Sequence, residues 1–156
     1  MFKLRNVTID DIQDILLINE DAIPAVNSVS YEEFLNFYEK KTYFKVAINN
    51  DKKICGFLLV LPSGLDYQSL NYKWFTERYS DFAYIDRIAI SSKFRRLGIG
   101  KSLYLDLENS LDEYNMIACE FNIEPPNPIS KSFHESLDYK NVGFQFTENN
   151  TKKVSL

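Results

Sequence analysis

Residues 85–108 read IDRIAISSKFRRLGIGKSLYLDLE, and they carry the strongest signal for fold and function in the chain. The apolar beginning predicts a strand, and apolar residues four positions apart, at Ile99, Leu103 and Leu107, predict a helix. At their junction, residues 94–103 hold three cations, two glycines and a hydroxyl. Cations and flexible backbone before a helix N-terminus are typical of a phosphate-binding loop.

Three phosphate-binding patterns compete for this loop. The nucleotide pattern G-x-x-x-x-G-K-[ST] finds its ending at residues 100–102, but its first glycine falls on Arg95. The dinucleotide pattern G-x-G-x-x-G finds Gly98 and Gly100, but Leu103 stands at its third glycine. The third pattern, R-x-x-G-x-G over residues 95–100, fits completely and lets the backbone approach a diphosphate. A plain strand-to-helix turn with solvated cations fits as well.

Composition limits the function classes. The chain has 156 residues, 45% hydrophobic and 26% charged, which predicts a single soluble domain over residues 1–156. A formal net charge of −4 argues against nucleic-acid binding, and we expect neither a membrane span nor a signal peptide. One histidine argues against a zinc site, so we expect no metal. Two cysteines in apolar stretches favour buried free thiols and a cytoplasmic location.

The predicted elements follow the order β-α-α-β-β-β-α-β-α-β-β, which indicates a mixed α/β domain. Strands are expected at FKLRNV, YFKVAI, KICGFLLVL, FAYIDRIAI, MIACEFNI, VGFQFTE and KKVSL. The first two helices should follow the N-cap residues Thr8 and Ser30, and Ser30 and Glu33 have the spacing of a capping box. The last helix should cover ISKSFHESL. Residues 62–81, rich in aromatic side chains, are expected to form a long loop.

The stretch 85–108 resembles the coenzyme A-binding core of the GNAT superfamily of N-acetyltransferases, where a bulged strand leads to R/Q-x-x-G-x-G/A. Downstream, NPISKSFHESLDY resembles the second GNAT motif, with Asn127 and Ser130 matching and His134 on the usual tyrosine. YFKVA, NYKWF, YIDRIAI, RRLGIG and PPNPISKSFH together resemble a bacterial group of GNAT acetyltransferases. The resemblance implies the GNAT fold: a mixed, mostly antiparallel sheet of about seven strands, flanked by about four helices and splayed at a bulge in the fourth strand.

The resemblance also implies acetyl-CoA (coenzyme A) as the cofactor and assigns residues to it. The pantetheine arm would lie along the backbone of Ile88, Ala89 and Ile90. The diphosphate would bind at Arg95, Arg96, Leu97, Gly98, Ile99, Gly100, Lys101 and Ser102. The second motif would add Asn127, Ser130 and Phe133, although Asn127 also suits a turn between two prolines and Phe133 a core position.

Direct attack of an amine on the thioester needs a deprotonated amine, a polarised carbonyl and a proton for the thiolate. The family uses a strand N–H, here that of Ile88 or a neighbour, to polarise the carbonyl. Asp86 and Glu120 are the candidate bases because each is expected in an apolar strand, where burial raises the pKa of a carboxyl. An ion pair between Asp86 and Arg87, or an exposed Glu120, is the alternative. His134 is the candidate general acid, or else a surface histidine.

The acceptor site is less visible in the sequence. The resemblance places it at the first two helices and the loop before the motif strand, which makes Asn19, Glu20, Tyr72 and Trp74 candidate substrate-binding residues. An aromatic ring near a carboxylate suits a cation, although packing of the aromatic residues onto the core explains them too.

The sequence therefore predicts an N-acetyltransferase acting on a small-molecule or peptide amine, with no nucleic-acid or membrane partner. The alternative from another class is a non-catalytic acyl-CoA-binding sensor, and thioester hydrolysis is a lesser option. The terminal strands could pair between two copies of the chain, and no residue pattern decides for or against a homodimer.

Overall fold

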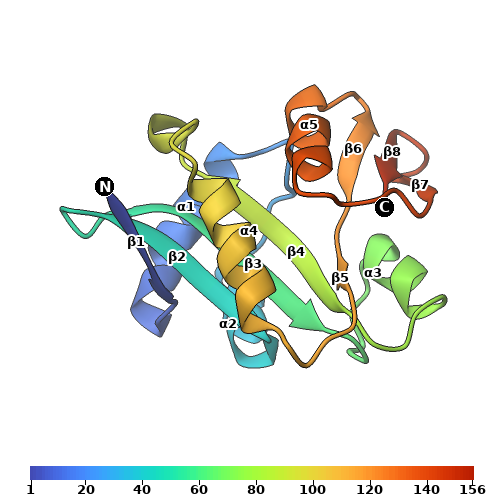
Figure 1. Cartoon of the computed structure of the whole chain (residues 1–156), viewed down its shortest axis with the longest axis horizontal. Coiled ribbons are helices and arrows are strands. Elements are labelled where there is room, and N and C mark those ends of the chain that lie inside the picture. Colours follow the sequence, from blue (N-terminus) through green and yellow to red (C-terminus); the bar gives the residue numbers. More distant parts are fainter. The chain divides into compact units, whose positions relative to one another are not determined.

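The structure is a computed structural model that describes residues 1–156. The chain forms two compact units (Figure 1). Unit 1 comprises Met1–Ser63 and Asp81–Ile117, and unit 2 comprises Gly64–Ser80 and Ala118–Leu156.

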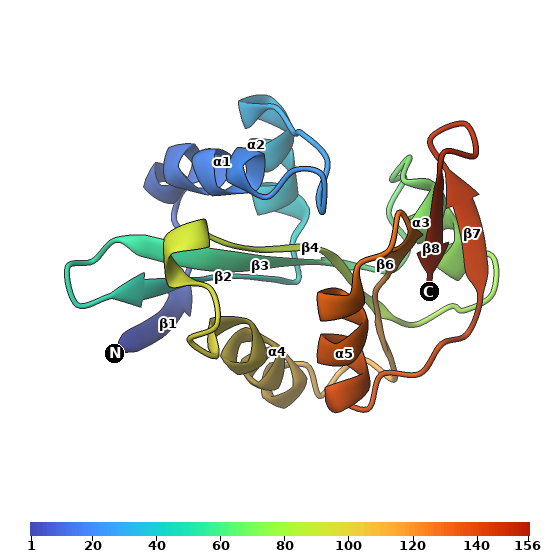
Figure 2. The ribbon, with the colours of Figure 1, turned by 90° about the horizontal axis from the view of Figure 1, so that it is seen from above.

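The larger sheet has five strands, whose spatial order follows the sequence: β1 (Phe2–Asn6), β2 (Tyr43–Asn49), β3 (Ile54–Pro62), β4 (Ala83–Ile90) and β5 (Ile117–Ala118). The first four strands are antiparallel to their neighbours. Figure 2 shows α1 (Ile12–Asp21) and α2 (Tyr31–Lys40) on one face of this sheet and α4 (Ile99–Ser110) on the other. Residues 55–61 of β3 are consequently buried on both faces and read as a continuous apolar run.

The helix starts follow from local capping. At α2, the Glu33 N–H donates to Ser30 Oγ at 3.1 Å and the Ser30 N–H donates to Glu33 Oε2 at 2.9 Å, which confirms the predicted capping box. A 3₁₀ turn, η1 (Ile9–Asp11), precedes α1, and the Thr8 N–H donates to Asp11 Oδ2 at 2.8 Å. The two terminal nitrogens of Arg5 in β1 hold the same carboxylate at 2.6 and 2.8 Å. The first helix is thereby tied to the first strand.

The fourth strand carries the expected bulge. Leu59 of β3 pairs with Arg87 and Val60 pairs with Ile85, so Asp86 is an extra residue in β4. A bulge of this kind bends the strand and re-aims the side chains beside it. It lies beside the residues that the sequence assigned to the cofactor arm.

Unit 2 holds an antiparallel sheet in the order β6 (Phe121–Glu124), β8 (Lys152–Ser155) and β7 (Phe144–Thr147), with the helices α3 (Leu70–Thr76) and α5 (Pro128–Ser136). Two details differ from the prediction. The expected strand MIACEFNI is divided into β5 and β6, which makes eight strands in place of about seven. The expected loop 62–81 contains α3, because Ser69 Oγ accepts the Tyr72 N–H and Tyr72 and Phe75, three apart, bury one face. The α/β fold class itself is confirmed.

Candidate active site

The loop before α4 has the backbone geometry of an anion-binding turn. The first α-helical hydrogen bond runs from the Ser102 N–H to the Gly98 carbonyl at 3.0 Å, so the N–H groups of residues 99–101 have no carbonyl one turn earlier. Gly98 has φ +78°, which favours glycine, and Arg96 also has a positive φ of 64°. The side chains of Arg95, Arg96 and Lys101 are exposed. Backbone donors and exposed cations together can hold a diphosphate.

Two side-chain contacts tie this loop to its surroundings. Arg95 Nε donates to the Ile90 carbonyl at 3.2 Å, and the N–H of Ser92 in the 3₁₀ turn η2 (Ser92–Phe94) donates to Asp21 Oδ2 at 3.1 Å. The hydrogen bonds from Ser92 hold the pKa of the Asp21 carboxyl below its usual value. Sequence reasoning missed Asp21 because it lies 71 positions from its partner.

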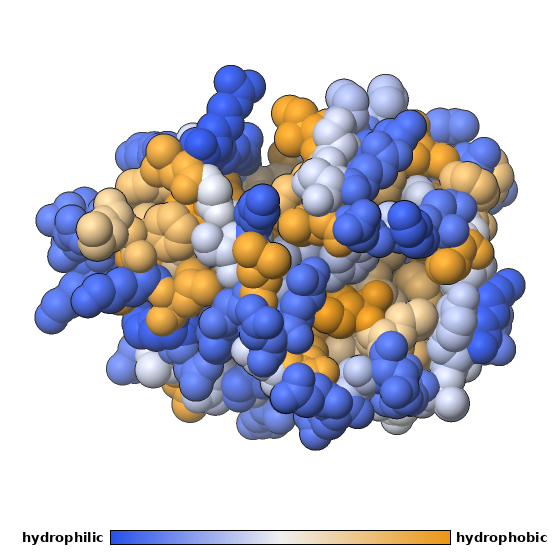
Figure 3. Space-filling model, in the orientation of Figure 1, coloured by the Kyte–Doolittle hydropathy of each residue, from blue (hydrophilic) through white to orange (hydrophobic).

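Figure 3 shows that the face carrying α4 mixes hydrophilic and hydrophobic side chains.

The segment Ile88–Ile90 pairs with β3 through Leu58, Phe57 and Gly56. β5 has two residues against eight in β4, so it accompanies β4 only near Ala83, whose N–H donates to the Met116 carbonyl at 2.9 Å. Gly56 is required opposite Ile90, since an added Cβ would lie 2.5 Å from Ile90 Cδ1 and 2.8 Å from the Ala89 carbonyl oxygen. Glycine thus allows the two strands to approach closely at this point.

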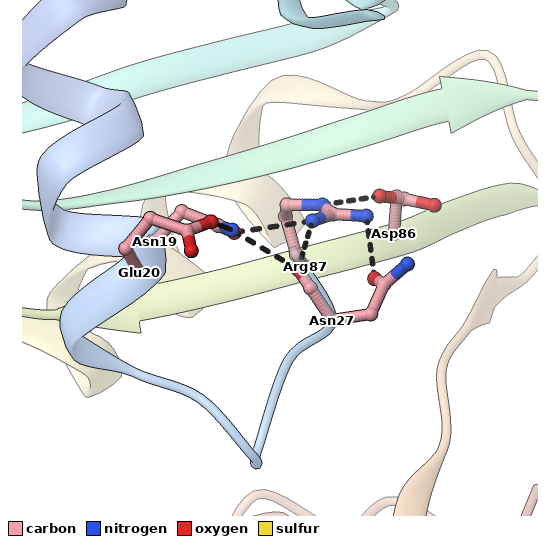
Figure 4. Close-up of polar contacts among 5 residues, drawn as sticks. All are labelled: Asn19, Glu20, Asn27, Asp86 and Arg87. Atoms are coloured by element: carbon pink, nitrogen blue, oxygen red, sulfur yellow. Dashed lines mark hydrogen bonds and ion pairs between the residues drawn. The ribbon is translucent and has the colours of Figure 1, made fainter. Parts of the chain in front are cut away.

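A polar network surrounds the bulge (Figure 4). Arg87 Nε donates to Asp86 Oδ2 at 2.7 Å, and each of these side chains is only 3% exposed. Arg87 Nη1 donates to Asn19 Oδ1 at 3.1 Å and to the Asn27 carbonyl at 3.2 Å, while Nη2 donates to Asn27 Oδ1 at 3.1 Å. The ion pair between Asp86 and Arg87, named above as the alternative for Asp86, is therefore present. The role of Asp86 as a base stays a prediction.

The two substrate candidates on α1 differ in exposure. Asn19 is fully buried, and its Nδ2 donates to the Asn27 carbonyl at 3.0 Å, so its amide is engaged inside unit 1. Glu20 is exposed, and its Oε1 accepts a hydrogen bond from Ser28 Oγ at 2.8 Å. Of the two, the Glu20 carboxylate is the one presented to solvent.

In unit 2, His134 lies on α5 and is 6% exposed, so it is not a surface histidine. Its ring stacks on Phe121 with the ring centres 5.5 Å apart. Nδ1 lies 2.8 Å from the Ser130 carbonyl oxygen, and since a carbonyl only accepts, Nδ1 carries the proton. Burial lowers the pKa of His134. The neutral ring therefore has to take up a proton at Nε2 before it can act as an acid.

The other residues of the second motif shape the start of α5. Asn127 is the N-cap, with Oδ1 accepting the Ser130 N–H at 3.1 Å, and Phe133 packs edge-on against His134. Glu120 is half-buried in the two-residue break between β5 and β6, so the expectation that it lies within a strand is wrong.

The aromatic substrate candidates also belong to unit 2. Tyr72 is 1% exposed, and its hydroxyl accepts the Leu65 N–H at 2.9 Å. The Trp74 ring carries the Arg78 guanidinium 4.0 Å above its centre and faces Gly143. Both rings make packing contacts within unit 2, and their role in substrate binding stays a prediction.

Two other kinds of site find no support. No group of three or more His, Cys, Asp or Glu side chains could hold a metal ion. Both cysteines are free, and burial raises the pKa of the Cys55 and Cys119 thiols, so neither is an activated nucleophile.

None of the helices has the length and apolar character needed to cross a bilayer.

Comparison with known proteins identifies the family. The sequence profile of the Acetyltransferase (GNAT) family matches residues 11–139. The chain belongs to the GNAT acetyltransferase family. No protein of curated function matches the sequence.

Solved GNAT structures share the fold at low sequence identity. The ribosomal-protein-S18-alanine N-acetyltransferase from Escherichia coli has a TM-score of 0.76 at 16% identity, covering 99% of this chain and 90% of that one. Arabidopsis thaliana NAA60 in complex with acetyl-CoA has a TM-score of 0.74 at 13% identity, with coverages of 99% and 96%. Arabidopsis thaliana Naa50 in complex with the bisubstrate analogue CoA-Ac-MVNAL has a TM-score of 0.72 at 13% identity, with coverages of 99% and 95%.

Proposed function

We propose that this GNAT protein transfers the acetyl group of acetyl-CoA to a primary amine of a small molecule or a peptide. The observation that carries the proposal is the start of α4, where residues 99–101 present N–H groups beside exposed cations. A diphosphate matches this arrangement, since its oxygens accept hydrogen bonds and its charge is opposite to that of the loop. Bound there, acetyl-CoA supplies a thioester that an amine can attack.

The residues of β4 suit the next part of the donor. We propose that the backbone of Ile88, Ala89 and Ile90 binds the pantetheine arm, with the Ile88 N–H polarising the acetyl carbonyl. The short β5 supports this proposal. It accompanies only the beginning of β4, so residues 88–90 lie beyond the part of β4 that β5 accompanies. Asn127, Ser130 and Phe133 are proposed as further donor contacts from α5.

Proton transfer completes the proposed chemistry. A primary ammonium has a pKa of about 10, so it must lose a proton before attack. We propose Asp86 or Glu120 as the group that accepts it, directly or through water. His134 is proposed to return a proton to the thiolate, after taking one up at Nε2.

Several finer proposals accompany this function. We propose that both units form one acetyltransferase domain, because the family profile runs from unit 1 into unit 2. Membership of the bacterial group with YIDRIAI, RRLGIG and PPNPISKSFH rests on those segments. A cytoplasmic location is supported by the two free thiols. The homodimer through the terminal strands stays a hypothesis.

Turnover of acetyl-CoA with a defined amine panel tests the function. Purified protein is mixed with acetyl-CoA and spermidine, L-lysine or the peptide Met-Val-Asn-Ala-Leu, and thiol release is followed with a chromogenic disulfide. Calorimetry measures acetyl-CoA binding in parallel. We expect binding together with amine-dependent thiol release. Binding without release for any amine would support the sensor, amine-independent release would indicate hydrolysis, and absence of binding would refute both leading functions.

A further inference from the structure

Arg87 joins three segments that are far apart in the sequence. Four of the five N–H donors of its guanidinium go to Asp86 beside it in the bulge, Asn19 on α1, and Asn27 in the α1–α2 connection, residues 22–30. Asn19 and Asn27 lie 68 and 60 positions from Arg87. The contact to Asp86 depends on the bulge, because consecutive side chains of a regular strand point to opposite faces.

The network reaches from the core to the surface of unit 1. Arg87 is 5% exposed, yet Asn27, which offers it both a carbonyl and a side-chain oxygen, is an exposed residue. The next residue, Ser28, donates from its hydroxyl to the exposed Glu20 carboxylate at 2.8 Å. Asn19 Nδ2 also donates to Glu20 Oε1 at 3.4 Å, so the guanidinium is linked to the Glu20 carboxylate both through Asn19 and through the α1–α2 connection.

Stability alone is a weak explanation for this arrangement. A buried ion pair seldom stabilises a protein more than apolar side chains of the same volume would, because both charges lose their hydration. The planar fork of arginine can, however, fix several acceptors at defined angles, which a lysine ammonium cannot do. The four bonds of Arg87 thus impose one geometry on the bulge and the exposed connection.

We propose that Arg87 is a positioning residue for the acceptor amine: it fixes the α1–α2 connection so that Glu20 meets a cationic substrate. The inference rests on the proposed acetyltransferase function and assigns its acceptor to the class of positively charged amines. Arg87 acts through Asn27 and Asn19 and need not touch the substrate.

Four variants test the proposal. Arg87→Met removes the fork, and Asn27→Ala removes one of its acceptors at an exposed position of the connection. The double variant tests whether the two act together. Arg5→Met is the matched control, because Arg5 is also bonded to a carboxylate in unit 1, at Asp11, but lies on β1.

Kinetics with spermidine and Met-Val-Asn-Ala-Leu, corrected for folded protein, provide the main measurement. We expect KM for the amine to rise about tenfold or more in Arg87→Met and severalfold in Asn27→Ala, while acetyl-CoA Kd stays within about twofold of the wild-type value. The double variant should be no worse than Arg87→Met, because both substitutions break the same link. Hydrogen exchange of residues 22–30 should become faster in these three variants and remain unchanged in Arg5→Met.

Each contrary outcome overturns a defined statement. An unchanged amine KM in Arg87→Met and Asn27→Ala, with an active wild-type enzyme, refutes the positioning role alone. So does an equal rise of KM in Arg5→Met, which would reflect general loss of stability. A wild-type protein that binds acetyl-CoA and acetylates no amine refutes the proposed function and the positioning role together.

Discussion

Replacing Gly98 with alanine separates backbone strain from cofactor binding. An added Cβ meets nothing within 4 Å, so the substitution has no steric cost from neighbouring atoms. Its cost comes from φ +78°, since a residue with a Cβ in the left-handed region is less stable by roughly 1–2 kcal/mol. Alanine also reduces the entropy of the unfolded chain, which offsets about 0.4–1 kcal/mol of this strain. The net effect expected is about 1 kcal/mol.

The strain at Gly98→Ala can lower either the free energy of unfolding or the affinity for acetyl-CoA. If the loop keeps its conformation, the free energy of unfolding falls by about 1 kcal/mol and acetyl-CoA Kd is unchanged, because the free and bound states are equally strained. If the loop relaxes, stability falls less, but binding must restore the left-handed geometry, and Kd rises by up to about tenfold, the equivalent of 1.4 kcal/mol. The two losses should together amount to the net effect of about 1 kcal/mol, which is the strain less the entropy offset.

Urea unfolding followed by circular dichroism and calorimetric titration of acetyl-CoA measure the two losses. Gly64→Ala is the matched control, because Gly64 has φ +85° and also meets nothing within 4 Å. It should lose a similar amount of stability and leave Kd unchanged. A rise of Kd in Gly64→Ala, or a Gly98→Ala protein with unaltered stability and unaltered Kd, would refute the reasoning.

Three further substitutions have defined outcomes. Arg5 holds the pKa of Asp11 below its usual value, so the carboxylate stabilises the fold above the unfolded pKa of about 3.9 and this contribution is lost as pH falls. Asp11→Asn should therefore cost on the order of 1 kcal/mol at pH 7, with the difference from wild type closing below about pH 4 in urea titrations. Gly143→Ala should destabilise the protein by about 1–3 kcal/mol and shift the fluorescence of Trp74, the single tryptophan, because a Cβ would overlap its ring. His134→Phe should lower kcat about 10²-fold or more and leave acetyl-CoA Kd within about twofold; an unchanged kcat and pH profile would remove histidine from the mechanism.

Local patterns in the sequence were enough to predict most of the elements. The Ser30–Glu33 spacing, the apolar run of β3 and the R-x-x-G-x-G loop before α4 all act through residues within one or two turns of each other. The division between β5 and β6 escaped prediction because MIACEFNI is apolar on both sides of Glu120. The helix α3 was hidden within an aromatic stretch, although Ser69, Tyr72 and Phe75 carry a cap and a helical spacing that could have revealed it.

Side-chain roles could not be read from the sequence in the same way. The sequence names Asp86 and His134 as polar residues near a bulge and a helix, and family resemblance supplies their expected chemistry. Whether such a group is paired or buried depends on partners 60 or more positions away, as for Arg87, or on rings from another element, as for His134 and Phe121. Periodicity and capping arise from neighbours along the chain, whereas the environment of a buried charge arises only when distant segments pack together.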